Sequence, residues 1–296
     1  MKKFFLMGLL ITTTSFLFAQ KADKIITAKE VERIERVLAA DEMKGRKVFT
    51  PEIDKAADFI ANEFKQAGLQ TLDGKGTYLQ SFAMVRSKFI SASGALDGKA
   101  IDQKNIIVIT SQEDFKTDQS AGFEKVMIKG GGSLFREAYG LVRSGKNYFV
   151  TVDTSYAKNF SRLAQLKSNM FKSDKAVVFV LAEKEPTTFS IEAKHEITEQ
   201  KLSNVVGILP GKSKKDEYVI FSGHYDHIGI GKATDGDSIF NGANDDAAGT
   251  TAVIMLAKYF KALGNNERTI VFAAFTAEEA GGFGSQYFSK QFDPAK

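Results

Sequence analysis

The segment YVIFSGHYDH at residues 218–227 decides the fold, because an apolar run leads there directly into possible metal ligands. A second apolar run, residues 269–275, leads in the same way into TAEEAGG at residues 276–282. Between the two runs, residues 247–263 carry apolar side chains at helical spacing, which predicts an amphipathic helix. A strand, a helix and a second strand in this order predict a parallel crossover within an α/β sheet.

Polar residues follow each predicted strand. His224, Asp226 and His227 come after the first strand, and Glu278 and Glu279 come after the second. In parallel α/β sheets, ligand-binding residues collect just beyond the carboxyl ends of the strands. The pattern therefore predicts that these side chains lie at one edge of the sheet.

A third polar segment, NGANDDAAGT at residues 241–250, places two carboxylates at the start of the predicted helix. Taken alone, Asp245 and Asp246 are typical of caps that complement the helix dipole. A pair such as Glu278 and Glu279, taken alone, is typical of a solvated helix start. The three segments together favour a functional site, because carboxylates then approach from three parts of the chain.

These segments resemble the two-zinc aminopeptidase family, which includes bacterial leucyl aminopeptidases, glutamate carboxypeptidase II and the non-catalytic transferrin receptor. The order and spacing of GHYDH, NGANDDAAGT and TAEEAGGFGS match that family across residues 201–290. Gly45, Arg46 and the helix expected after Thr50 resemble its N-terminal region. The implied fold is an α/β zinc exopeptidase type, with a mixed, largely parallel sheet flanked by helices.

The resemblance also implies a role for each matching residue. His224 would bind one zinc ion, Asp245 would bridge two ions, and Glu279 would bind the other. Glu278 would be the general base, since a carboxylate beside the metal-bound water can move its proton to the leaving amine. Asp226 would orient His224, because histidine ligands usually need their second ring nitrogen held.

Two further features follow from the same resemblance. It implies a cis peptide bond between Asp245 and Asp246, and it gives His227 no metal role. His195, which lies outside the matching segments, is not expected to be a ligand either.

The family pattern is incomplete in this chain. Each zinc ion of the family takes one further ligand from beyond the Glu-Glu motif, an aspartate and a later histidine. Only 17 residues follow Glu279, their sole acid is Asp293, and no histidine follows His227. We therefore expect each metal to lack one ligand and the C-terminal part of the sheet to be missing. A fragment of a longer reading frame is favoured over a truncated, non-catalytic relative.

The chain divides into a signal peptide at residues 1–19, an N-terminal part of the peptidase domain at 20–87, a β-rich insert at 88–199 and a truncated catalytic core at 200–296. The insert occupies the place where many relatives carry a protease-associated domain, although its sequence does not match that domain convincingly. In the N-terminal part, capping and stop signals predict helices over about 28–40 and from Pro51 to Gly68.

The first 19 residues have a basic start and an apolar run, Phe4 to Phe18, which predicts a secretory signal peptide. A membrane anchor is the alternative, but the run is shorter than the ~20 residues that a spanning helix needs. We expect a secreted or periplasmic protein without stable membrane insertion after cleavage.

Composition excludes several classes of protein. The 40 basic residues are scattered among 36 acidic ones, so no basic block is available for nucleic acid. The absence of cysteine excludes disulfides, thiolate nucleophiles and cysteine zinc sites.

The resulting hypothesis is a secreted zinc-dependent exopeptidase, an aminopeptidase that hydrolyses N-terminal residues from peptides. A carboxypeptidase or a glutaminyl cyclase is the related alternative, and a non-catalytic binding module on the same fold is the alternative from another class.

Overall fold

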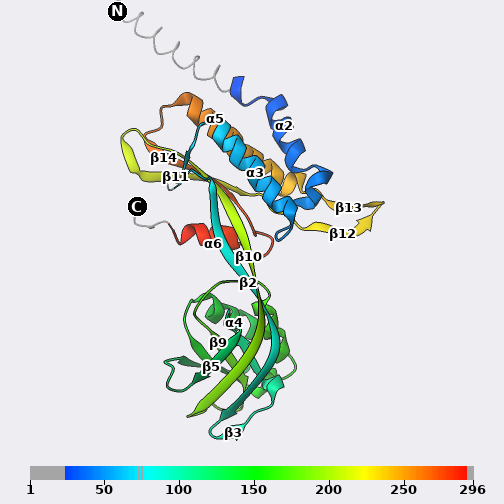
Figure 1. Cartoon of the computed structure of the whole chain (residues 1–296), viewed down its shortest axis with the longest axis vertical. Helices are drawn as coiled ribbons and strands as arrows, with labels where there is room; N and C mark the ends of the chain where they lie inside the picture. The colour runs from blue at the N-terminus through cyan, green and yellow to red at the C-terminus, as the bar shows by residue number, and fades with distance from the viewer. Residues whose placement is uncertain (1–23, 73, 75, 292–296) are drawn as a thin grey trace, which may run out of the picture. The chain divides into compact units, whose positions relative to one another are not determined.

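The computed structural model describes residues 24–72, 74 and 76–291 (Figure 1). The predicted signal peptide lies outside these residues. The described chain forms two compact units: unit 2 runs from Ala83 to Gln200, and unit 1 comprises the rest. The insert was expected at 88–199. Two long strands, β2 (Leu79–Leu96) and β10 (Phe189–Leu209), each begin in one unit and end in the other.

The sheet of unit 1 is built on the predicted crossover. Strand β11 (Lys214–His224) pairs in parallel with β14 (Arg268–Phe275), and helix α5 (Ala248–Leu263) connects them. Strand β14 pairs antiparallel with β10, and β10 pairs antiparallel with β1 (Gln70–Thr71). The expected mixed sheet flanked by helices is confirmed. It is not largely parallel among the described residues, because its strands pair in parallel at the crossover and antiparallel at β10 with β14, β1 and β5 (Asp114–Asp118).

The two N-terminal helices are also confirmed. Helix α2 (Ala28–Leu38) begins after Thr27, whose hydroxyl oxygen accepts a hydrogen bond from the backbone N–H of Glu30 at 3.2 Å. Helix α3 (Pro51–Gln66) begins after Thr50, but this hydroxyl donates to the carbonyl of Lys47 at 2.7 Å and does not cap the helix. None of the helices in the described part of the chain is long and apolar enough to cross a membrane.

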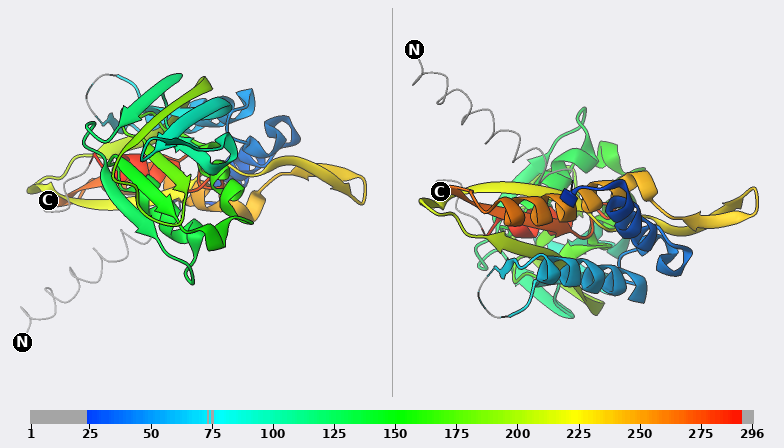
Figure 2. Two further views of the ribbon diagram at one scale, coloured as in Figure 1. Left: turned by 90° about the horizontal axis from the view of Figure 1, so that it is seen from below. Right: turned by 90° about the horizontal axis from the view of Figure 1, so that it is seen from above.

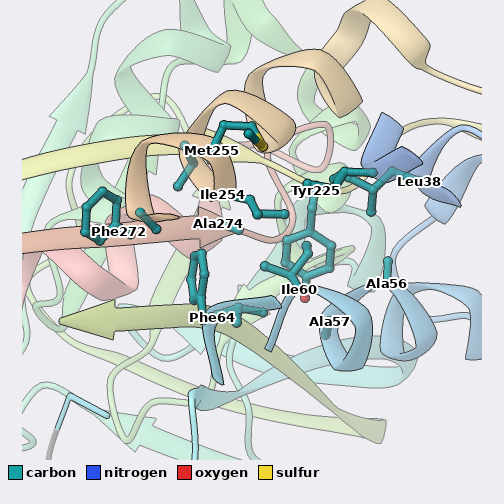
Figure 3. Close-up of a cluster of buried hydrophobic side chains, with 14 of the residues drawn as sticks. Leu38, Ala56, Ala57, Ile60, Phe64, Tyr225, Ile254, Met255, Phe272 and Ala274 are labelled. Atoms are coloured by element: carbon teal, nitrogen blue, oxygen red, sulfur yellow. The ribbon is translucent and has the colours of Figure 1, made fainter. Parts of the chain in front are cut away.

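Alternating residues of β14 pack on opposite faces of the sheet. Ile270, Phe272 and Ala274 belong to the main core of unit 1. Figure 3 shows Phe272 and Ala274 with Ile60 and Phe64 of α3 and Ile254 and Met255 of α5. Val271 and Ala273 instead pack with the short helix α6 (Phe283–Ser289). Because both faces are buried, the strand is apolar throughout, as expected for a parallel sheet with helices on both sides. The right-hand view of Figure 2 shows α2 and α3, in blue, and α5, in orange, on the side of unit 1 that faces the viewer.

A group of charged side chains joins these three helices. The ammonium of Lys258 on α5 donates to Glu30 at 2.6 Å and to Glu63 at 2.7 Å. Arg33 on α2 donates to Glu63 at 2.7 Å as well. Arg33 and Lys258 together lower the pKa of Glu30 to about 2.

A hairpin of β12 (Gly229–Thr234) and β13 (Asp237–Phe240) completes unit 1 and extends away from its helices (Figures 1 and 2). The 3-10 segment η1 (Asp41–Arg46) packs on this hairpin through Gly45. A Cβ atom at Gly45 would lie 2.4 Å from the carbonyl oxygen of Phe240, and φ is +66°. Glycine is therefore required at this contact.

Unit 2 contains a sheet in the order β4-β9-β7-β6, in which β6, β7 and β9 run parallel and β4 antiparallel. Unit 2 is rich in strands, as expected for the insert, and α4 and 3-10 segments pack with its sheet. Its elements besides β2 and β10 are β3 (Lys99–Ala100), η2 (Gln103–Asn105), β4 (Ile106–Ile109), β5 (Asp114–Asp118), β6 (Glu124–Ile128), α4 (Leu134–Arg143), β7 (Tyr148–Val152), η3 (Thr154–Tyr156), η4 (Phe160–Lys167), β8 (Met170–Phe171) and β9 (Val177–Leu181).

Strand β11 lies at the edge of the sheet formed by the described residues. Tyr218, Val219 and Ile220 on this strand are 38%, 38% and 45% exposed. Successive strand residues point to opposite faces, so apolar surface is exposed on both sides of the edge. An edge of this kind is a template for pairing with another chain.

Replacing Ile220 with Lys is expected to reduce self-association, because a charge on an edge strand opposes edge-to-edge pairing. Stability should change by no more than about 0.5 kcal/mol, as for other surface substitutions. Light scattering at matched concentration, together with a thermal melt, measures both effects. Phe135→Lys is the control, since Phe135 is 41% exposed but lies on helix α4. An equal reduction in both variants would argue against the edge strand as the cause.

His195 makes unit 2 sensitive to acid. Its side chain is 3% exposed, and among the described residues its ring nitrogens make no hydrogen bond of ordinary geometry, the backbone of Val108 being the polar group that acts on the ring. Burial, and then the positive charge of Lys167, lower the pKa of His195 from 6.5 to about 4. A base with a depressed folded-state pKa contributes stability above its unfolded pKa, and this stability is lost as pH falls.

Lowering the pH from 6.5 to 4 is therefore expected to cost up to about 3 kcal/mol of unfolding free energy through His195. Calorimetric melts of the wild type and His195→Phe across this range measure the effect. As pH falls, the melting temperature of the wild type should decrease more than that of His195→Phe. The other titrating groups are the same in both proteins, so their effects cancel in this comparison. Parallel pH curves for the two proteins would contradict the role of His195.

Candidate metal centre

The parallel pairing of β11 with β14 brings the ends of the two strands together. His224, the last residue of β11, lies opposite Phe275, the last residue of β14. The backbone N–H of Tyr225 donates to the carbonyl of Phe275 at 2.9 Å, which extends the pairing by one residue. The segments that carry His224 and Glu279 therefore leave the sheet side by side.

Tyr225 anchors the first of these segments. Its ring is 1% exposed and packs in the main core, and its hydroxyl donates to the carbonyl of Ser203 at 2.5 Å (Figure 3). Successive side chains of an extended segment point to opposite faces, so the side chain of His224 points away from the core that holds Tyr225. An aromatic anchor between two polar residues thus limits how far the segment can move.

The third segment enters through the π-helical turn η5 (Ala243–Ala247). The peptide bond between Asp245 and Asp246 is cis, as the family resemblance implied. The carboxylate of Asp246 accepts from the backbone N–H of His224 at 3.0 Å and from that of Gly249 at 3.1 Å. A Cβ atom at Gly249 would lie 2.1 Å from this carboxylate, so only glycine leaves it room.

Four possible ligands meet where the three segments converge. The Nε2 atom of His224 lies 3.1 Å from Oδ1 of Asp245. The Nδ1 atom of His227 lies 2.8 Å from Oε1 of Glu279. Ligand atoms of His227, Asp245 and Glu279 all lie within 4.8 Å of one another. The structure therefore brings the three sequence-predicted ligands to one place and adds His227 to them.

This set of donors fits a zinc ion. Imidazole nitrogens and carboxylate oxygens are ordinary zinc ligands, and zinc takes them in tetrahedral geometry at about 2.0–2.2 Å. Tetrahedral ligands at that bond length are about 3.3 Å apart. The contacts of 3.1 Å between His224 and Asp245 and of 2.8 Å between His227 and Glu279 are close to this spacing, but they are separate pairs, and the group of mutually close ligand atoms comprises only His227, Asp245 and Glu279. The side chain of Asp245 is 63% exposed, so the site is open to solvent.

Asp226 connects two of the converging segments. Its carboxylate is fully buried and accepts from the backbone N–H groups of Glu278 at 3.0 Å and Glu279 at 3.2 Å. Asp226 contacts the His224 ring more closely through its backbone than through its carboxylate, since Nδ1 of His224 lies 3.1 Å from the Asp226 carbonyl oxygen and 3.8 Å from Oδ1. Burial raises the pKa of Asp226 to about 6, although the hydrogen bonds from the N–H groups of Glu278 and Glu279 and the charge of His224 oppose that change.

Glu278 precedes Glu279 in the chain and has an exposed side chain. Its backbone is held in a tight turn, in which Ala277 has φ +56° and the N–H groups of Gly281 and Gly282 donate to the Glu278 carbonyl at 2.8 and 2.9 Å. The role of Glu278 as a general base remains a prediction.

His227 and Arg46 are the side chains whose position here was not anticipated. For His227, the sequence contains one signal, the His-x-x-His spacing from His224, which places a second imidazole just beyond the strand end. For Arg46, the sequence shows only an arginine next to a glycine. Burial of that arginine is apparent only in the folded chain.

Comparison with known families matches residues 204–296 to peptidase family M28. A probable zinc metalloprotease of Pyricularia oryzae is 37% identical over 92 residues, which cover 31% of this chain and 18% of that protein. Aminopeptidase NAALADL1 of Rattus norvegicus is 33% identical over 95 residues, which cover 30% of this chain and 11% of that protein. The chain thus spans less than a fifth of either relative. The resemblance to the two-zinc aminopeptidase family is confirmed for the C-terminal third of this chain.

Solved structures similar to the chain include a zinc aminopeptidase from Bacillus subtilis, with 18% identity, a TM-score of 0.44, and coverage of 90% of this chain and 66% of that one. An aminopeptidase from Aneurinibacillus sp. strain AM-1 has 16% identity, a TM-score of 0.45, and coverage of 93% and 68%. A peptidase M28 precursor from Shewanella amazonensis SB2B has 16% identity, a TM-score of 0.45, and coverage of 93% and 70%.

Replacing Asp226 with Asn is expected to weaken zinc binding about 10–100-fold, as is typical when a group that holds the ligands is lost. The amide NH2 would face one of the two backbone N–H groups that the carboxylate now accepts. Competition with a chromophoric chelator measures the dissociation constant. Asp118→Asn is the control, because Asp118 accepts from a backbone N–H of Ser120 at 2.7 Å in unit 2. Equal zinc affinity in both variants would contradict the role of Asp226.

Proposed function

We propose that this protein is a zinc-dependent peptidase. Two observations support the proposal: residues 204–296 match peptidase family M28, and possible metal ligands gather near the ends of β11 and β14. The observation that carries the proposal is the convergence of His224, His227, Asp245 and Glu279 from three segments of the chain. Caps and solvated acid pairs do not explain this arrangement, because each side chain contacts a partner from another segment.

Each residue has a defined task in this proposal. His224, Asp245 and Glu279 hold zinc, and His227 is the fourth donor beside them. When bound, the metal lowers the pKa of a water molecule toward about 7 and polarises the scissile carbonyl. The carboxylate of Glu278 accepts the proton of the attacking water and then gives it to the leaving amine. Asp226 keeps Glu278 and Glu279 in place through their backbone N–H groups.

The finer parts of the proposal rest on the family resemblance. We assign two zinc ions, with Asp245 between them, and peptide substrates that lose their N-terminal residue. The similarity to aminopeptidase NAALADL1 of Rattus norvegicus supports this choice over a carboxypeptidase. The basic and apolar pattern of residues 1–19 supports export from the cytoplasm.

The adjacent glutamates provide a matched test. Glu278→Gln is expected to lower turnover of a leucine anilide about 10²–10⁴-fold while bound zinc is retained, because this residue moves a proton and does not ligate. Glu279→Gln is expected to lose zinc itself, because an amide is a poor zinc ligand. Elemental analysis of the purified proteins gives zinc per chain, and the anilide assay gives turnover.

Both measurements are needed to judge the proposal. Wild-type protein that binds no zinc when zinc is supplied at neutral pH would contradict a metallopeptidase. Full turnover in Glu278→Gln would contradict the assignment of the general base. Zinc loss in Glu278→Gln and retention in Glu279→Gln would exchange the two roles.

A further inference from the structure

Arg46 is the largest fully buried side chain in the described part of the chain. Its guanidinium makes no ion pair there, and its four hydrogen bonds all go to backbone carbonyl oxygens. A buried charge of this kind is costly unless every donor is satisfied. The structure must therefore gain something specific from placing an arginine at this point.

The four acceptors belong to three different segments. The Nε atom donates to the Tyr225 carbonyl at 2.7 Å, between His224 and Asp226. Nη1 and Nη2 donate to Asn241 at 2.6 Å and Gly242 at 2.9 Å, at the entrance of the turn that carries Asp245. Nη1 also donates to Leu38 at the end of α2 at 2.5 Å.

The backbone of Arg46 adds a fifth connection. Its carbonyl accepts from the N–H of His227 at 3.3 Å. Arg46 has φ +46°, and the preceding Gly45 packs against Gly229 and Phe240 of the β12–β13 hairpin. The side chain is thus held from both sides and has little freedom to move away.

We propose that Arg46 is a positioning residue that sets the distance between the two metal-ligand loops, residues 224–227 and 241–245. The planar guanidinium presents its donors in a rigid fork, so one side chain can bind carbonyls of two loops at fixed spacing. His224 and Asp245, whose side chains are 3.1 Å apart, come from these two loops. This role rests on the proposed function only in so far as the loops bind zinc.

The positive charge of Arg46 also favours a close approach of the two loops. Burial lowers the pKa of the Arg46 guanidinium, and the negative charges of Asp226, Asp246 and Asp245 oppose that change. A permanent cation behind the loops offsets part of the repulsion among these carboxylates, and it does so without occupying the ligand positions.

Arg46→Lys tests the proposal, because lysine keeps the charge but loses the fork. Hydrogen exchange in the zinc-free protein is expected to accelerate about tenfold or more in peptides covering 224–228 and 241–247, and little in the rest of unit 1. The zinc dissociation constant is expected to rise about 10–100-fold. Arg33→Lys is the control, since Arg33 bonds Glu30 and Glu63 away from these loops.

A second pair of variants keeps the test valid should Arg46→Lys fail to fold. A Cβ atom at Gly242, where φ is +62°, would lie 2.7 Å from Nη2 of Arg46 and 2.7 Å from the ring of His227. Gly242→Ala is therefore expected to give the same local exchange pattern. Gly264→Ala is its control, because φ there is +57° and the nearest atom is 3.7 Å away.

The outcomes separate this inference from the proposed function. Accelerated exchange confined to both loops supports the positioning role, even if the wild-type protein binds no zinc and the peptidase proposal fails. Exchange that rises in only one loop, or rises uniformly, would overturn the positioning role. The same conclusion holds if the Arg46 and Gly242 variants behave like their controls.

Discussion

The parallel register between β11 and β14 is the constraint on which the remaining structure depends. Parallel neighbours need a long connection, and here α5 provides it while covering one face of the sheet. The same register places His224 opposite Phe275, so that both strands end at one level. Because the turn before α5 starts at that level too, three segments far apart in sequence converge without any long unsupported loop.

Polar groups then hold the converging segments: Arg46 and Asp226 are buried, and Asp246 is half-buried. The carboxylates of Asp226 and Asp246 each accept two hydrogen bonds, of which at least one crosses from one segment to another. Arg46 supplies donors to the carbonyls of the same region. A half-satisfied network would destabilise the fold, because an unpaired buried charge costs more than a hydrogen bond returns. Arg46 uses four of its five N–H donors, and Asp226 and Asp246 accept two hydrogen bonds each, so the network holds the segments that carry the candidate ligands.

Sequence reasoning anticipated the parts of this arrangement that depend on local pattern. Helices α2, α3 and α5 follow from capping and periodicity, and the crossover follows from two apolar runs around a helix. Ligand convergence follows from the rule that parallel strands end together. Asp226 and its partner Glu278 are 52 residues apart in the sequence. Arg46 and its partner Tyr225 are 179 residues apart. No local pattern encodes such contacts, which is why a single sequence did not show them.

Two adjacent glutamates receive different environments from the same turn. Ala277 turns the backbone with φ +56°, after which Asp226 binds the N–H groups of both Glu278 and Glu279. Because both amides are held, neither residue can rotate its backbone to exchange places with the other. Both residues are exposed, and the side chain of Glu279 contacts His227. In the proposed function the first carboxylate, that of Glu278, carries the proton, and the second binds the metal.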